Sequence, residues 1–195
     1  MKFEFEECRR LVLAAVLAEL EVGKSNFVPD PVAGQFGADS RPSISGIGLD
    51  IAPWHRRFYL ALRDDDEKWD KSLRYEIGDW KLYPLNGLVN PPAIAASAAA
   101  IDYIGDAYES VAGDQLRNVA HMIFLSAAEA LLDEAVHQRF QQYGIDAPYI
   151  VEDFPPHRCF EYVVTDEDGS IALNYCELVI ANRITNRLRG QMSLP

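Results

Sequence analysis

Residues 115–143 form a long stretch of the chain that contains neither glycine nor proline. Asp114 precedes the stretch as a typical helix N-cap, and Gly144 follows it as a typical stop. Its middle, HMIFLSAAEALL, is apolar around most of a helical circumference, which is typical of a helix packed on several sides. We therefore predict one long central helix, against which the remaining elements pack.

Three further segments show helical spacing of their apolar residues. The first is residues 5–22, which Gly23 ends, and the second begins near Pro92 and runs through Ile104, with Gly105 as a weak point inside it. The third is residues 175–189, where Asn174 and Glu177 resemble a capping box at the start. These patterns predict helices at both ends of the chain as well as at its centre.

Strand patterns occupy the intervals between these helices. Residues 47–51 and 57–63 alternate apolar and other side chains around the short link APWH, which predicts a β-hairpin. A third strand is expected at 79–83, and the runs on either side of DEDG, between residues 160 and 175, predict a second hairpin. We expect a single α+β domain over residues 1–195, with an antiparallel sheet packed against helices and a mobile connection at 24–42.

The charge of the chain limits its partners. It carries 30 acidic and 18 basic residues, a formal charge of −12, which argues against nucleic acid and favours a basic protein as partner. No apolar run is long enough to cross a bilayer, so no membrane association is expected. Acidic residues flank the apolar stretch 11–18 and argue against a signal peptide, while three cysteines without a CxxC pair favour a cytoplasmic protein.

A Glu/His pair in the long helix is the one pattern that resembles half of a metal site. Glu134 and His137 are three residues apart, and helical spacing places Glu134 on the half-buried stripe of the helix. Helical carboxylate sites use this motif twice together with further glutamates, and the sequence holds no second ExxH. We therefore expect no metal and no other cofactor, and we expect Asp133 and His137 to form a surface pair.

The link between the first two strands concentrates residue types that dominate protein interfaces. Trp54, His55, Arg56, Arg57 and Tyr59 fall within six positions of one another in APWHRRFY. Acidic residues Asp64, Asp65 and Asp66 follow at the other end of the second strand, about 20 Å away in an extended chain. These two groups are the predicted protein-binding residues, the first for contact and the second for electrostatic steering. Polar positions of an ordinary hairpin and a solvated turn explain the same residues equally well.

No GxGxxG, P-loop, GxSxG or HExxH motif occurs in the chain. This absence favours a non-enzymatic binding or regulatory protein of a bacterial type, for example an antidote that neutralises a toxin. The alternative is a small enzyme, a hydrolase or transferase, that uses His55, His157 or Glu134, or a Cys–His pair from His157 and Cys159. A pocket that gathers two or more of these groups would favour the enzyme.

Overall fold

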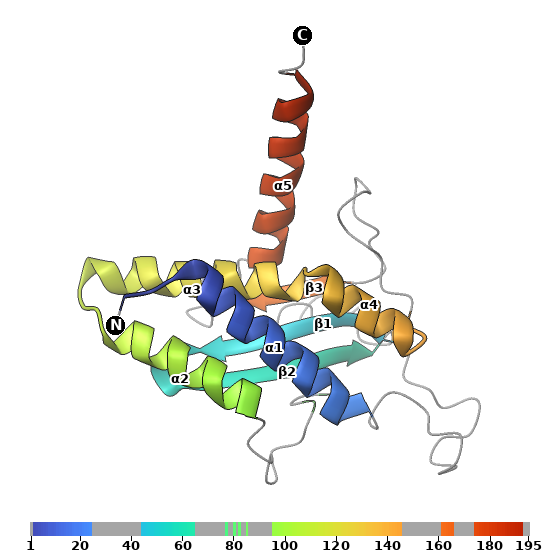
Figure 1. Ribbon diagram of the computed structural model, residues 1–195, viewed down its shortest axis with the longest axis horizontal. Coiled ribbons are helices and arrows are strands. Elements are labelled where there is room, and N and C mark those ends of the chain that lie inside the picture. The colour runs from blue at the N-terminus through green and yellow to red at the C-terminus, as the bar shows by residue number, and fades with distance from the viewer. Residues whose placement is uncertain are drawn as a thin grey trace.

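The computed structural model describes residues 2–24, 44–64, 77, 80, 82, 85, 95–145, 161–165 and 174–192. In chain order these residues form α1 (Phe5–Gly23), β1 (Ile44–Ala52), the 3-10 helix η2 (Pro53–His55), β2 (Arg57–Asp64), α2 (Ala95–Glu109), α3 (Asp114–Leu131), α4 (Glu134–Gln142), β3 (Glu161–Thr165) and α5 (Tyr175–Met192). Five α-helices and three strands confirm the predicted α+β class for this part of the chain (Figure 1).

The predicted first hairpin is confirmed, but the sheet is mixed rather than antiparallel. Its strand order is β2-β1-β3, and β1 pairs antiparallel with β2 in a register that joins Leu49 to Leu60. On its other edge β1 pairs parallel with β3, and Leu49 lies opposite Val164. A parallel pair needs a long crossover connection, and here helices α2, α3 and α4 lie in the chain between β1 and β3. The predicted antiparallel pairing is therefore correct for β1 and β2 and wrong for β1 and β3.

Two other predicted strand features lie mostly outside the described residues. Of the third strand expected at 79–83, Trp80 and Leu82 are described, and Leu82 forms an isolated antiparallel bridge with Leu62. The second strand of the DEDG hairpin lies outside the described residues, as does the connection 24–42 except for Lys24.

Both faces of the sheet bear buried residues, which explains why β1 is buried along almost its whole length. Ile47, Leu49 and Ile51 of β1 belong to the main core, which they share with α1 and α3. On the opposite face, Ala61, Ile77, Trp80 and Val163 form a second, smaller cluster. Gly48 points to that face, where an added Cβ would lie 2.9 Å from the Trp80 ring, so only glycine allows the indole to pack against β1 at this point.

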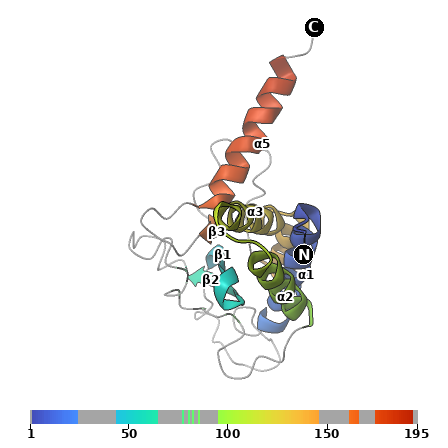
Figure 2. The same cartoon turned by 90° about the vertical axis from the view of Figure 1, so that its left-hand side faces the viewer.

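Helices α1, α2 and α3 cover the main-core face of the sheet, as Figure 2 shows from one end of the molecule. The buried stripe of α1 faces α2 and α3 and consists of Cys8, Val12, Ala15, Val16, Leu20 and Gly23. Helix α5 behaves differently, because only its first turns are buried and the rest stands out from the body (Figure 1). None of the described helices is long and apolar enough to cross a membrane.

The predicted long central helix is two helices, α3 and α4, that meet at Asp133. The backbone of Asp133 is extended, with φ −73° and ψ 144°, and its side chain accepts a hydrogen bond of 3.0 Å from the Ala135 amide. The same carboxylate accepts a hydrogen bond of 2.6 Å from Arg9 of α1. An aspartate can therefore begin a new helix inside an apolar run that has neither glycine nor proline. At the start of α3 the N-cap is Gly113, one residue before the predicted Asp114.

This break also corrects two predictions about the neighbouring residues. Glu134, which we expected to be half-buried, is exposed in the first turn of α4 and accepts a hydrogen bond from Gln138. The change of direction at Asp133 shifts the helical phase, so the stripe of α3 does not continue into α4. Asp133 pairs with Arg9, and the expected surface pair between the Asp133 and His137 side chains is absent among the described contacts.

The junction of α3 and α4 provides a stability test. We expect Asp133→Ala to lower the free energy of unfolding by about 1 to 2 kcal/mol, because it removes both the N-cap of α4 and the Arg9 pair. Glu134→Leu, at the adjacent exposed position, should change it by less than about 1 kcal/mol. Urea unfolding of the two variants measures both values, and an equal loss for Glu134→Leu would show that Asp133 is not the cap.

Helices α1 and α2 run antiparallel and are joined by a partly buried hydrogen bond. The Ser97 hydroxyl of α2 donates to the Glu19 carboxylate of α1 over 2.6 Å. Burial raises the pKa of Glu19 above its ordinary value, and the bond from Ser97 offsets part of this rise. A raised pKa means that the folded state binds more protons than the unfolded chain, so this group stabilises the fold below about pH 4 and loses that contribution as the pH rises.

Replacing this carboxyl should therefore stabilise the protein in a pH-dependent way. We expect Glu19→Gln, which keeps an acceptor for Ser97, to raise the melting temperature at pH 7 and to match the parent chain below about pH 4. Glu21→Gln is the matched control, because hydrogen bonds from Lys24 and Tyr143 lower the pKa of exposed Glu21, and its loss should not stabilise at pH 7. Thermal unfolding across this pH range measures the difference in melting temperature. Equal melting temperatures for Glu19→Gln and the parent at every pH would contradict the expectation.

Candidate functional site

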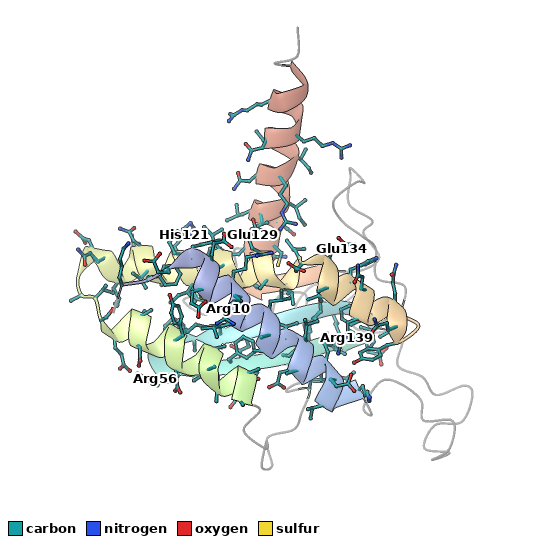
Figure 3. The ribbon with its side chains drawn as sticks, viewed as in Figure 1. Arg10, Arg56, His121, Glu129, Glu134 and Arg139 are labelled. Carbon is teal, nitrogen blue, oxygen red and sulfur yellow. The ribbon has the colours of Figure 1, made fainter. Side chains whose placement is uncertain are left out.

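The corner between β1 and β2 is attached to helix α2 by one arginine. Arg56 follows η2 with a left-handed backbone, φ 49° and ψ 44°, and its guanidinium extends along the outer surface of α2. There Nη2 lies 2.8 Å from Asp106 and 2.7 Å from Glu109, and a weaker contact of 3.9 Å reaches Asp102. The hydrogen bonds that Arg56 donates to Glu109 and Asp106 raise its pKa further, so the side chain stays charged. Figure 3 shows Arg56 beside α2.

A glycine in α2 makes this contact close. A Cβ added at Gly105 would lie 2.8 Å from the Arg56 side chain, so the arginine crosses the helix where no side chain stands in its way. Gly105, which the sequence indicates as a weak point inside this helix, is thus the position that leaves room for the Arg56 side chain. We call the set of Arg56, Gly105, Asp106 and Glu109 the arginine clamp.

The clamp holds Trp54 against the end of α2. The Trp54 and Tyr108 rings lie 6.0 Å apart at a tilt of 54°, and both side chains pack against the main core while remaining half-buried. These two rings border a cavity of about 580 Å³, which we call the aromatic pocket. Its other walls come from the first turns of α3 and the start of α5, so four elements from three separate regions of the chain build it.

A second group of rings lines the pocket from α3 and α5. Tyr175, the first residue of α5, is 3% exposed, and its ring centroid lies 5.2 Å from those of Phe124 and His121. The Tyr175 hydroxyl lies 3.2 Å from His121 Nδ1, which fixes the orientation of an otherwise exposed imidazole. Figure 3 shows His121 on α3, close to the base of α5. Arg117 and Asn118 complete the polar part of the lining.

The predicted protein-binding residues occupy different environments around this corner. Trp54 borders the pocket, His55 is exposed, and Arg56 is part of the clamp. Arg57 bonds over 3.0 Å to Asp50, which is 6% exposed, and Tyr59 is half-buried on β2. Asp64 lies at the far end of β2, as expected, whereas Asp65 and Asp66 lie outside the described residues.

The residues of the predicted alternatives do not meet in the described part of the chain. Glu134 on α4 and Arg56, the neighbour of His55, lie well apart in Figure 3. The described residues include no group of three or more potential metal ligands, and His137 Nε2 lies 3.0 Å from Gln141. His157 and Cys159 lie outside the described residues. Cys8 and Cys176 are buried free thiols, and burial raises the pKa of Cys8 to about 11 and that of Cys176 further still.

Sequence patterns identified only one border residue of the aromatic pocket. Trp54 belonged to the predicted hairpin group, whereas His121, Phe124 and Tyr175 follow the ordinary apolar and polar spacing of helices. The residues come from positions 54 to 175 of the chain, so no local motif could have indicated them. Comparison of the chain with models of protein families, with curated proteins and with solved structures gives no match.

The arginine clamp leads to a prediction about the order of stability of two variants. Arg56→Ala and Arg56→Gly both remove the bonds to Asp106 and Glu109, but only glycine adopts the left-handed backbone without strain. We expect the parent to be the most stable chain, Arg56→Gly to be intermediate and Arg56→Ala to be the least stable. Asp102→Asn should have the same melting temperature as the parent, because the contact of Asp102 with Arg56 is 3.9 Å long. Thermal unfolding gives the order, and a Gly variant less stable than the Ala variant would contradict it.

Proposed function

We propose that this protein is a non-enzymatic binding module that acts by contacting another, basic protein, in the manner of an antidote that neutralises its target. The observation that supports this proposal is an exposed row of carboxylates on the outer helices. Asp102, Asp106 and Glu109 of α2 have side chains that are 76%, 57% and 59% exposed, and α2 contains neither lysine nor arginine. Their one described cationic partner is Arg56.

The start of α1 extends this row. The Tyr103 hydroxyl of α2 lies 2.8 Å from the Glu4 amide, so the beginning of α1 adjoins the middle of α2. At this end of α1 the side chains of Glu4 and Glu6 are 62% and 80% exposed, and they pair with Lys2 over 3.1 Å and with Arg9 over 3.5 Å. We call Glu4, Glu6, Asp102, Asp106 and Glu109 the acidic ridge. Clustered surface charge of one sign increases the rate at which an oppositely charged partner associates.

The β1–β2 corner lies at the end of this ridge and supplies the contact element of the proposal. Arg56 joins the corner to α2, so exposed His55 and half-buried Trp54 are held next to Asp106 and Glu109. Aromatic side chains at a rigid corner are typical anchors of protein interfaces. In this arrangement the ridge guides a basic partner, and the corner with Trp54 forms the lasting contact.

The enzymatic alternative has less support from the described geometry. His55 and Glu134, two of its three groups, do not share a pocket, and the buried cysteines are poor nucleophiles because their pKa values are raised. The aromatic pocket contains one imidazole, that of His121, and none of its described lining residues is a carboxylic acid or a thiol that could act with it.

The proposal is tested by capturing a partner from cell extract on the immobilised chain at low salt and measuring association rates with the purified partner. We expect Glu6→Gln combined with Asp102→Asn to slow association and weaken its salt dependence. Trp54→Ala should mainly speed dissociation. The matched control is Glu134→Gln combined with Glu177→Gln, which removes the same charge from exposed positions on α4 and α5.

Two results would contradict the proposal. An equal effect of the control pair would show that net charge, and not the acidic ridge, governs association. A captured partner that is acidic, or whose association rate is insensitive to salt and to both pairs of changes, would show that the ridge does not guide it.

A further inference from the structure

The aromatic pocket has the dimensions and composition of a small-molecule site, and none of its described lining residues belongs to the acidic ridge. Its volume of about 580 Å³ falls within the usual range for ligand pockets, about 300 to 1,000 Å³. Two groups of rings line it: Trp54 with Tyr108, and Phe124 with Tyr175. Rings of this kind bind planar apolar molecules by stacking and edge contacts.

The walls of the pocket are held in place before any ligand binds. Phe124 and Tyr175 are 2% and 3% exposed, so their rings are fixed by the core behind them. Trp54 is fixed from the other part of the fold by the arginine clamp. A ligand would therefore cost little reorganisation of these side chains on binding.

The polar part of the pocket is rich in hydrogen-bond donors and lacks carboxylates. Arg117, Asn118 and His121 contribute to it, and none of the described lining residues is an aspartate or glutamate. The whole chain has 30 acidic residues, so the composition of this pocket differs from that of the molecule around it. Such a lining favours a ligand with anionic oxygen atoms.

Arg117 differs from most other arginines of the described part of the chain. It makes no hydrogen bond or ion pair with a described residue, although it lies in an acidic protein. Six other arginines each contact a carboxylate, namely Arg9, Arg10, Arg56, Arg57, Arg139 and Arg183. The guanidinium of Arg117 is thus available at the pocket for the paired hydrogen bonds that arginine forms with a carboxylate or phosphate.

We propose that the aromatic pocket binds a small planar aromatic molecule that carries an anionic group, a carboxylate or a phosphate. The ring of the ligand contacts the half-buried rings of Trp54 and Tyr108, and Arg117, with His121 beside it, binds the anionic oxygens. No covalent step is involved. The proposal goes beyond the binding of a protein partner and does not depend on it, because its variants leave the acidic ridge and Trp54 intact.

The test is isothermal titration calorimetry of the full chain with two anionic probes, indole-3-acetate and phenyl phosphate. Their neutral counterparts, indole-3-acetamide and phenol, are titrated in parallel. We expect at least one anion to bind with saturation and its neutral counterpart to bind about tenfold more weakly. The pair with the larger ratio of anion affinity to neutral affinity identifies carboxylate or phosphate as the preferred group, because the ring is the same within each pair. In an NMR titration with the same probes, the ring-proton resonances of His121 should shift, and His121→Gln is used to assign them.

Variants then locate the binding of the charge. Arg117→Gln should weaken the anion about tenfold and leave the neutral counterpart unchanged. Arg187→Gln is the matched control, since this exposed arginine of α5 lies twelve positions, about 18 Å of helix, beyond Tyr175 and should bind like the parent. Arg117 is exposed, so its variant should fold, and its melting temperature verifies this.

Three results would overturn the proposal. They are the absence of binding by both anions at millimolar concentration, equal affinity for an anion and its neutral counterpart, and an Arg117→Gln variant that binds the anion like the parent. Any of these can occur while a protein partner still binds, and loss of the protein partner leaves the probe titrations unaffected, so failures of the two proposals are distinguishable.

Discussion

Strand β1 is the element on which the other parts of this fold depend. It is hydrogen-bonded to a strand on each side and covered on both faces, so its backbone groups and side chains are almost all removed from water. Burial of this kind favours apolar or very small residues, and Gly48 is such a residue where the Trp80 ring approaches the strand. Buried Asp50 is the exception, and it pairs with Arg57. The helices of the main core then cover the face that carries Ile47, Leu49 and Ile51.

The position of the aromatic pocket follows from how the chain leaves this strand. After Ala52 it turns through η2, and Arg56 ties the turn to α2 across Gly105. This contact sets Trp54 against Tyr108, whereas Phe124 and Tyr175 are positioned independently by the packing of α3 and α5. The cavity lies where these two groups of rings meet. A clamp between charged surface residues thus contributes to the shape of an apolar site.

Charge is distributed unevenly over the described part of the molecule. Carboxylates gather on the outer faces of α1 and α2, where their cationic neighbours are Lys2 and Arg9 on the first and Arg56 on the second. The described lining of the pocket has no carboxylate and contains Arg117 and His121. The two surfaces therefore favour ligands of opposite charge. This separation is the physical reason for proposing a basic protein at the ridge and an anionic small molecule in the pocket.

The sequence alone determined the α+β class, the β1–β2 hairpin and the helices α1 and α5, because each depends on the periodicity and turn residues of one short segment. Tertiary structure decided three other features. Asp133 divides the predicted long helix because its carboxylate accepts hydrogen bonds from both the Ala135 amide and Arg9, which lies 124 positions away. Strand β3 runs parallel because the crossover, not its composition, sets its direction. The aromatic pocket joins Trp54 to Tyr175, and periodicity within a segment carries no information about which distant segments will share a cavity.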